Sequence, residues 1–107
     1  MNLRQLRQFV TLAETGNFHR AAEMLHMAQP PLSVSIRKLE EEMGEALFER
    51  RSTGVFLTTV GEAMLADARP TLFHAEHFRQ AVMDARQAQR GLLRMGIIGP
   101  APYALLP

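Results

Sequence analysis

The sequence contains no cysteine and no tryptophan among its 107 residues. Without cysteine, the chain can form neither disulfide bonds nor thiolate metal sites. No apolar run reaches the roughly 20 residues of a membrane span, and the opening Met1-Asn2-Leu3-Arg4 lacks the apolar segment of a signal peptide. We therefore expect a cytoplasmic protein with no membrane partner, long enough for one small domain and an appendage.

An excess of positive charge is also missing, because the formal net charge at pH 7 is only +1. Residues 1–58 hold seven lysines or arginines and seven aspartates or glutamates. A strongly basic balance is the usual mark of a nucleic-acid-binding protein. Binding of that kind would have to depend on where the charges lie.

Signatures of catalysis are absent as well. The sequence shows no Ser-His-Asp arrangement with a scaffold to hold it and no glycine-rich phosphate loop, and a concave active site is hard to build in so short a chain. His74 and His77 have the spacing of a metal pair, but no third ligand is suitably placed. We predict a protein that is not an enzyme, with no metal and no cofactor in this segment.

Three helices are predicted for the first 43 residues. The first, over about 3–15 and ended by Gly16, follows from an apolar stripe made of Leu3, Leu6, Phe9, Val10 and Ala13. Asn17 is expected to cap a short second helix through about Leu25. In the tight turn that follows, His26 is expected to take a positive φ. The paired alanines Ala21 and Ala22 of the second helix let a neighbouring helix cross closely, as a helix-turn-helix requires.

The third helix is predicted from about Pro30 to Met43, with Gly44 as its left-handed cap. Its inward stripe is Leu32, Ile36, Leu39 and Met43. Its outward residues are Ser33, Val34, Arg37, Lys38 and Glu41. Short side chains near the start allow the helix end to approach another surface closely, and free amides there favour an anion such as phosphate.

Residues 46–58 form two short apolar runs around a polar turn, which predicts a hairpin with Arg50, Arg51, Ser52 and Thr53 at its tip. A long helix is then predicted from Thr59 to about Gln89. Thr59 and Glu62 have capping-box spacing. Pro70 removes one backbone amide, which predicts a kink near Ala66 to Pro70.

This long helix carries apolar residues at alternating spacings of four and three, the repeat that brings two helices together. The stripe is Met64, Ala68, Thr71, Ala75, Phe78, Val82 and Ala85, with Thr71 as its weak point. The predicted dimer interface consists of Met64, Ala68, Leu72, Ala75, Phe78 and Val82. Gly91 is expected to end the helix, and the run Leu92 to Ile98 is expected to form a strand.

Taken together, residues 3–62 resemble the N-terminal winged helix-turn-helix domain of LysR-type transcriptional regulators. The series AAE-L-QPPLS, the segments LFERR and LTTVGE, and the ending of the third helix occur in order and at the family's spacing. The resemblance implies a mainly α fold in which three helices and a short β-hairpin wing over 1–58 precede a long dimerising linker helix over 59–90. Residues 91–107 would begin a truncated effector-binding domain.

The resemblance also implies a function. The chain would bind double-stranded promoter DNA as a homodimer at an interrupted dyad, with the third helix in the major groove and the hairpin in the flanking minor groove. In the full-length form it would form a tetramer, respond to a small-molecule inducer held by the missing domain, and contact RNA polymerase. Its place would be the bacterial nucleoid, as an activator or a repressor.

By the same resemblance, Gln29 reads a base edge directly, whereas Arg37 or Lys38 binds phosphate. Many family members carry arginine where this sequence has Val34. The valine cannot make the base contact implied for that arginine. It could instead contact the methyl group of a thymine where the arginine would read a guanine. The implied DNA-contacting residues are Gln29, Pro30, Pro31, Ser33, Val34, Arg37, Lys38, Arg50, Arg51, Thr53 and Thr58.

Other interpretations of the same residues remain open at this stage. Arg37 and Lys38 could be solvated surface paired with the glutamates that follow them, and Gln29 could be a helix cap. A different class of function, a helical protein-interaction module, would also suit the pattern. Steep salt dependence of sequence-selective DNA binding separates the two functions.

Overall fold

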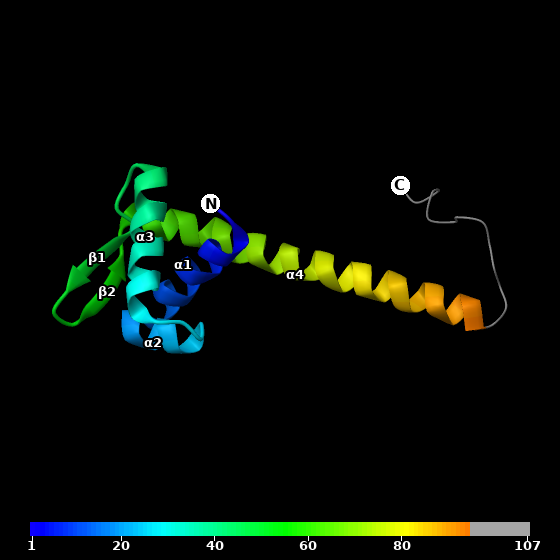
Figure 1. Cartoon of the computed structure of the whole chain (residues 1–107). Coiled ribbons are helices and arrows are strands. Elements are labelled where there is room, and N and C mark those ends of the chain that lie inside the picture. Colours follow the sequence, from blue (N-terminus) through cyan, green and yellow to red (C-terminus); the bar gives the residue numbers. More distant parts are fainter. Residues whose placement is uncertain (95–107) are drawn as a thin grey trace. The chain divides into compact units, whose positions relative to one another are not determined.

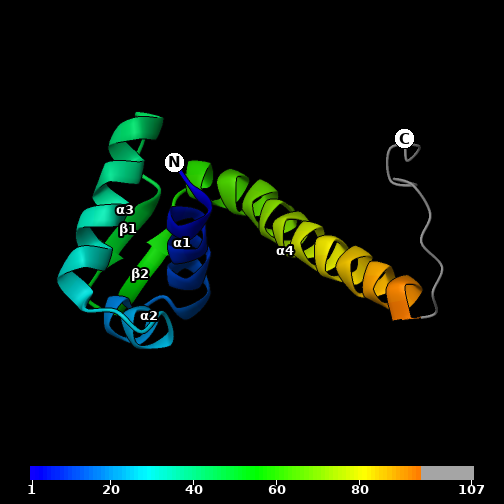
Figure 2. The same cartoon turned by 45° about the vertical axis from the view of Figure 1, so that its right-hand side comes forward.

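A computed structural model of the chain describes residues 1–94. The element order is α1 (Leu3–Thr15), α2 (Phe18–Met24), α3 (Gln29–Met43), β1 (Phe48–Arg51), β2 (Gly54–Leu57) and α4 (Thr59–Arg94) (Figure 1). The described part is thus mainly helical with one antiparallel hairpin, as the sequence predicts. The chain divides into two compact units, Met1–Phe73 and His74 onward; α1 to α3 and the hairpin gather in the first (Figure 2).

Backbone signals in the sequence fix the ends of the first three helices. Gly16 ends α1 at a φ of 65° and Gly44 ends α3 at a φ of 72°, both in the left-handed region. Asn17 caps α2 by accepting a hydrogen bond of 3.0 Å from the backbone amide of Arg20. His26 has a φ of 54° in the turn between α2 and α3. Each of these predictions is confirmed, although α3 begins one residue earlier than predicted.

The core of the first unit lies where α1, α2, α3 and the hairpin meet. Phe9 of α1 and Phe48 of β1 pack with ring centroids 5.4 Å apart. The predicted stripes need two corrections at their ends, because Leu3 and Met43 are exposed. The buried apolar residues are Leu6, Phe9, Val10, Leu12, Phe18, Ala21, Ala22, Leu32, Ile36, Leu39, Leu47, Phe48 and Ala68.

The hairpin pairs Phe48 with Leu57 and Arg51 with Gly54, leaving a two-residue turn at Ser52 and Thr53. Arg50 and Arg51 therefore lie within β1, and their predicted place at the tip is wrong. The amide of Val55 donates a hydrogen bond of 2.9 Å to the carbonyl of Gly16, which attaches the hairpin to the end of α1.

The start of helix α4 is hydrogen-bonded to the loop before β1, and we call this contact, made at Thr58 and Gly61, the joint. The hydroxyl of Thr58 accepts a hydrogen bond of 3.0 Å from the amide of Gly61 and donates one of 2.7 Å to the carbonyl of Ala46. Thr58 is thus the cap, and the predicted cap at Thr59 is wrong. A Cβ on Gly61 would lie 2.1 Å from the carbonyl oxygen of Leu47, so only glycine fits here.

The far end of α4 departs from the prediction. The helix continues through Gly91 to Arg94, so the predicted break at Gly91 is wrong, and residues 92–94 are helical where a strand was predicted. A single glycine inside a helix costs only about 1 kcal/mol relative to alanine, which its neighbours can offset. The rest of the predicted strand, 95–98, lies outside the described residues. Pro70 lies inside α4, and the kink near it stays a prediction.

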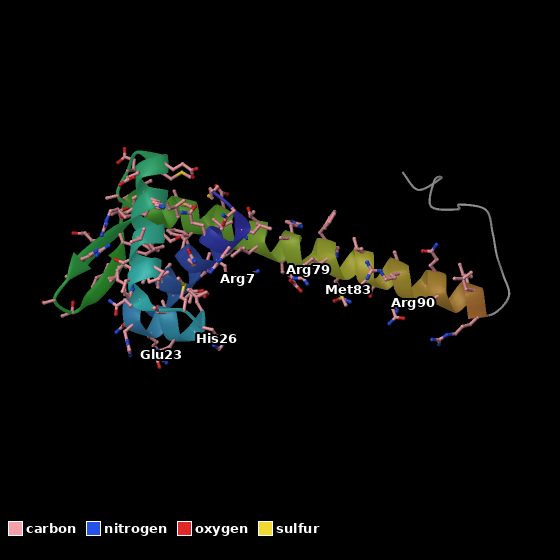
Figure 3. All side chains as sticks on the ribbon, viewed as in Figure 1. Arg7, Glu23, His26, Arg79, Met83 and Arg90 are labelled. Carbon is pink, nitrogen blue, oxygen red and sulfur yellow. The ribbon has the colours of Figure 1, made fainter. Side chains whose placement is uncertain are left out.

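The apolar residues of α4 fall into two groups, one buried and one exposed. Ala68 is only 3% exposed and belongs to the core of the first unit, with Met64 and Leu72 packed against it. These three predicted interface residues therefore cover their own domain. Phe78 and Val82 are 71% and 47% exposed, and Arg79, Met83 and Arg90 project from the same half of the helix (Figure 3). No helix among residues 1–94 is long and apolar enough to cross a membrane.

Candidate nucleic-acid interface

The N-terminal edge of α3 is exposed and short. Ala28 occupies the cap position without a side-chain hydrogen bond, and Gln29, Pro30 and Pro31 form the exposed first turn. Gln29 is therefore not a side-chain cap, and its amide makes no hydrogen bond with the residues that the structure describes. Because proline has no backbone N–H, Gln29 carries the one free backbone N–H among these three residues. Two of the first three positions of α3 therefore offer no backbone N–H to a phosphate, and anion binding at this helix end stays a prediction.

The basic residues of α3 lie on the same exposed face, two turns further along. Neither Arg37 nor Lys38 makes an ion pair or hydrogen bond with any described residue. Two of the nearby glutamates, Glu40 and Glu42, have other partners. Glu40 accepts hydrogen bonds from the amides of Leu47 (2.8 Å) and Phe48 (3.2 Å), so that it joins α3 to the base of the hairpin. Both cations are left to pair with something outside the described residues.

Glu42 is the other glutamate with a defined role, since it pairs with the N-terminal ammonium of Met1 at 2.7 Å. The alternative interpretation, in which Arg37 and Lys38 pair with the glutamates that follow them in the helix, requires ion pairs that are not formed in the part of the chain described. The face between Gln29 and Lys38 consists of short, polar or apolar side chains first and cations later. The short N-terminal side chains of such a face can enter a groove of the DNA, and the cations further along the helix can then contact phosphates.

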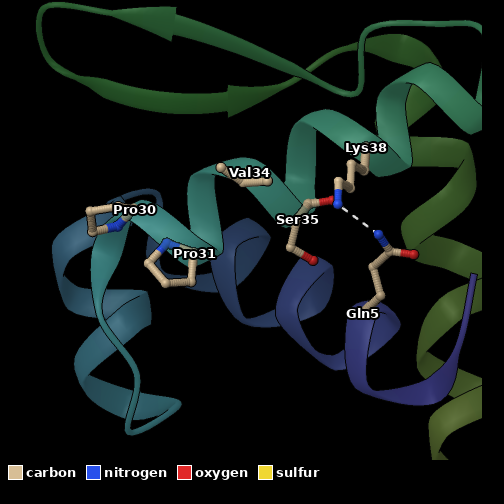
Figure 4. A pocket seen from close by; sticks show the side chains of 6 residues that line it. All are labelled: Gln5, Pro30, Pro31, Val34, Ser35 and Lys38. Carbon is tan, nitrogen blue, oxygen red and sulfur yellow. Dashed lines mark hydrogen bonds between the residues drawn. The ribbon is translucent and has the colours of Figure 1, made fainter.

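A buried glutamine holds α3 in place. Gln8 of α1 is 5% exposed; its Oε1 accepts a hydrogen bond from the hydroxyl of Ser35, and its Nε2 lies 3.7 Å from the sulfur of Met27. The Nε2 of Gln5 donates a hydrogen bond of 3.0 Å to the carbonyl of Ser35 (Figure 4). These contacts connect α1 with α3 and, through Met27, with the turn before it.

This network was not predicted from the sequence. Gln8 lies one turn before Leu12, which is fully buried, so a second buried face of α1 was the available signal. A buried amide needs partners, because an unpaired buried polar group costs about 1–3 kcal/mol. Gln8 therefore specifies the position of α3 rather than merely filling space.

The two arginines of the hairpin lie on opposite faces, since successive strand residues alternate. The guanidinium of Arg50 stacks 4.6 Å from the ring centroid of Phe18 in α2. That of Arg51 stacks at the same distance over Phe56 and pairs with Glu49 at 3.2 Å. The compact basic cluster that the sequence analysis predicted is therefore divided between two faces.

The hydrogen bonds of Thr58 disagree with its predicted contact to a DNA phosphate. Its one hydroxyl hydrogen is donated to the carbonyl of Ala46, so the hydroxyl has no proton left for a phosphate oxygen. Thr53, in contrast, is exposed in the turn of the hairpin. Among residues 1–94, no group of three histidine, aspartate or glutamate side chains is placed to hold a metal ion.

Comparison with known proteins gives one consistent answer. The family model for the bacterial regulatory helix-turn-helix protein, lysR family, matches residues 3–62. The HTH-type transcriptional regulator TfdS of Cupriavidus pinatubonensis is 46% identical over 110 residues, which cover 100% of this chain and 36% of TfdS. The chain thus spans about a third of the length of this relative.

Solved structures agree with the sequence relatives. The DNA-binding domain of CbnR in complex with DNA is 40% identical with a TM-score of 0.75, covering 80% of this chain and 99% of that one. The DNA-binding domain of BenM on benA site 1 DNA is 39% identical with a TM-score of 0.76, covering 79% and 99%. The hairpin beside three helices is therefore the wing of a winged helix-turn-helix. The chain belongs to the LysR family of bacterial regulatory helix-turn-helix proteins.

Proposed function

We propose that this chain binds double-stranded promoter DNA sequence-selectively, as a dimer on an interrupted dyad, and acts in transcription regulation. Helix α3 enters the major groove with Gln29 foremost, and the hairpin follows the flanking minor groove. Two relatives of similar fold, the CbnR and BenM domains, were solved with DNA. The TfdS relative is named as a transcriptional regulator and not as an enzyme.

One observation carries this proposal: the exposed face of α3 leaves its base-reading and phosphate-binding groups without partners among the described residues. Gln29 can offer both a donor and an acceptor to adenine. Arg37 and Lys38 can each neutralise a phosphate, so that binding releases counterions and weakens with salt. The small net charge of +1 is compatible with this, because Glu40 and Glu42 of α3 are engaged elsewhere.

The partner that forms the dimer is a second copy of this chain, meeting it along the C-terminal half of α4. Phe78, Val82, Ala85 and Leu92 follow one another at helical spacing and are exposed. An apolar stripe of this kind is buried when two helices pack together. Ala75 is half-buried and lies at the start of the stripe.

In the full-length form we propose a tetramer that responds to a small-molecule inducer and contacts RNA polymerase. These properties concern the two thirds of the length of relatives such as TfdS that this chain does not cover. We place the inducer site outside residues 1–94, and no cofactor is proposed for this segment. The cytoplasm, on the bacterial nucleoid, is the location that such a function requires.

Affinities of two variants for cognate and random duplexes, at one fixed salt concentration, test the function. Gln29→Ala should lower cognate affinity, relax preference at one base-pair step by roughly 1–3 kcal/mol and leave random binding nearly unchanged. Arg37→Ala should weaken both duplexes by similar factors. If Gln29→Ala weakened binding to the cognate and the random duplex equally, Gln29 would contact phosphate and would not read a base. Salt-insensitive protein binding without DNA selectivity would favour an interaction module instead.

The hairpin can be tested separately by changing Arg50 and Arg51 to alanine one at a time. Each neutralised phosphate contributes about 0.9 to the slope of log affinity against log salt, so a residue on the DNA-facing side should lower the slope by that amount. Because the two side chains lie on opposite faces, we expect unequal slopes. Circular dichroism controls for Arg50→Ala, which also loses its stacking on Phe18. Unchanged slopes for both variants would make the arginines ordinary surface.

A further inference from the structure

A shallow groove runs along the N-terminal half of α3 and faces α1. It is lined by Gln5, Pro30, Pro31, Val34, Ser35 and Lys38 (Figure 4). Val34 is 43% exposed; it lies one helical turn after the two prolines, so the valine methyls and the two pyrrolidine rings form one apolar surface. Valine is stiff at χ1, and the position of its methyl groups is therefore fixed before any ligand arrives.

The polar side chains of the groove are turned to partners in the protein. The Nε2 of Gln5 donates to the carbonyl of Ser35, and the hydroxyl of Ser35 donates to buried Gln8. Lys38, at the far end of the groove, has no ion pair with a described residue. The groove thus presents the apolar surface of Val34 and the two prolines, with the cation of Lys38 beside it.

The edges of the four base pairs in a major groove differ in which apolar group they expose. Guanine and adenine present N7 acceptors and an oxygen or amino group, and cytosine presents an amino group, whereas thymine adds a C5 methyl group. A valine side chain gains from a methyl group and leaves an amino or carbonyl group without a partner. The unpaired cation of Lys38 suits the phosphate that lies near such a base.

From this arrangement we propose that Val34, supported by the ring of Pro31, is a specificity site for the C5 methyl group of a pyrimidine in the major groove. The ligand class is thymine or 5-methylcytosine. The inference rests on the proposed DNA-binding function and deepens it. Reading by Val34 requires no hydrogen bond and therefore distinguishes methylated from unmethylated pyrimidines at one step of each half-site.

Base analogues that change only the methyl group test this site. The 107-residue chain is first used to select its preferred duplex from a random pool, and affinities are measured by fluorescence anisotropy. Each thymine is then replaced singly by deoxyuridine. Removing one buried methyl group should weaken binding about fourfold at one position of each half-site. At the same position, 5-methylcytosine should bind about fourfold more tightly than cytosine.

The methyl dependence must belong to Val34 and not to the duplex alone. With Val34→Ala, the deoxyuridine penalty at that position should fall below about twofold, and Val34→Thr, which keeps one methyl group, should lie between. Val60→Ala is the matched control, because Val60 of α4 is a valine of nearly equal exposure, 41%. It should keep the full penalty.

Two failures are distinguishable. If the chain selects a duplex but no thymine shows a penalty that depends on Val34, the methyl site is overturned while DNA binding stands. If the chain selects no duplex at all, the proposed function falls and the methyl site falls with it.

Discussion

The two halves of α4 carry apolar residues at the same helical spacing but bury them differently. Met64 and Leu72 pack against the core of the first unit, and Ala68 is buried in it, whereas Phe78 and Val82 lie exposed. The periodic pattern shows that a face will be covered. It does not show whether the cover is the protein's own core or a second molecule.

The difference is sharpest at the two glycines of α4 for which the surroundings are defined. Gly61 is buried, with the carbonyl of Leu47 directly against it, while a Cβ at Gly91 would meet no described atom within 4 Å. The first glycine is required by close packing. The second lowers helix stability without a packing reason among residues 1–94.

The largest effect is expected for Gly61→Ala. Its new methyl group would lie 2.1 Å from a backbone oxygen, so the loop before β1 or the start of α4 must shift. Overpacking of this kind typically costs 1–3 kcal/mol, and we expect about 3 kcal/mol because the obstacle is backbone. Urea denaturation followed by circular dichroism measures the loss. An unchanged midpoint would show that the joint is loose.

The exposed half is tested by changing Phe78 and Val82 together to glutamate. Placing two charges in a helix interface should weaken dimerisation by more than about 30-fold, corresponding to the 2 kcal/mol of a hot spot. Sedimentation velocity should then show monomers, with the urea midpoint of the first unit unchanged. Met83→Glu is the control, since Met83 is also exposed but lies on another side of the helix. Dimers that persist in the double variant would move the interface elsewhere.

The smallest effect is expected for Gly91→Ala. Where only helix propensity acts, alanine stabilises an exposed helix by about 0.5–1 kcal/mol relative to glycine. Helical ellipticity should rise slightly, and hydrogen exchange of neighbouring amides such as that of Arg90 should slow. A weaker dimer in sedimentation would contradict this expectation and would place the partner helix against Gly91.

Much of the first unit could be predicted because local signals coincide there. Gly16, Asn17, His26 and Gly44 mark the helix ends, and each takes the backbone conformation or cap that its residue type favours. At Gly91 the same signal fails. Gly44 reaches a φ that only a left-handed cap needs, while Gly91 remains inside a helix that tolerates it at a small cost.

The candidate site was predictable as a set of residues but not in its arrangement. The outward position of Val34 and Arg37 follows from helical periodicity. The separation of Arg50 from Arg51 follows from strand alternation, once both are known to lie in β1 and not in the turn. The cap at Thr58 could not be read locally, because the hydrogen bond to Ala46 that favours it over Thr59 is a tertiary contact.

The joint at Thr58 and Gly61 also determines where this protein can bend. The amide of Thr58 donates to the carbonyl of Leu47 at 3.0 Å, its hydroxyl is bonded on both sides, and the space at Gly61 is filled. The start of α4 thus moves with the base of the wing as one body. For the proposed dimer on two half-sites, a hinge that adjusts their spacing would lie further along α4, and Pro70, which leaves the carbonyl of Ala66 without its helical donor, is the nearest weak point.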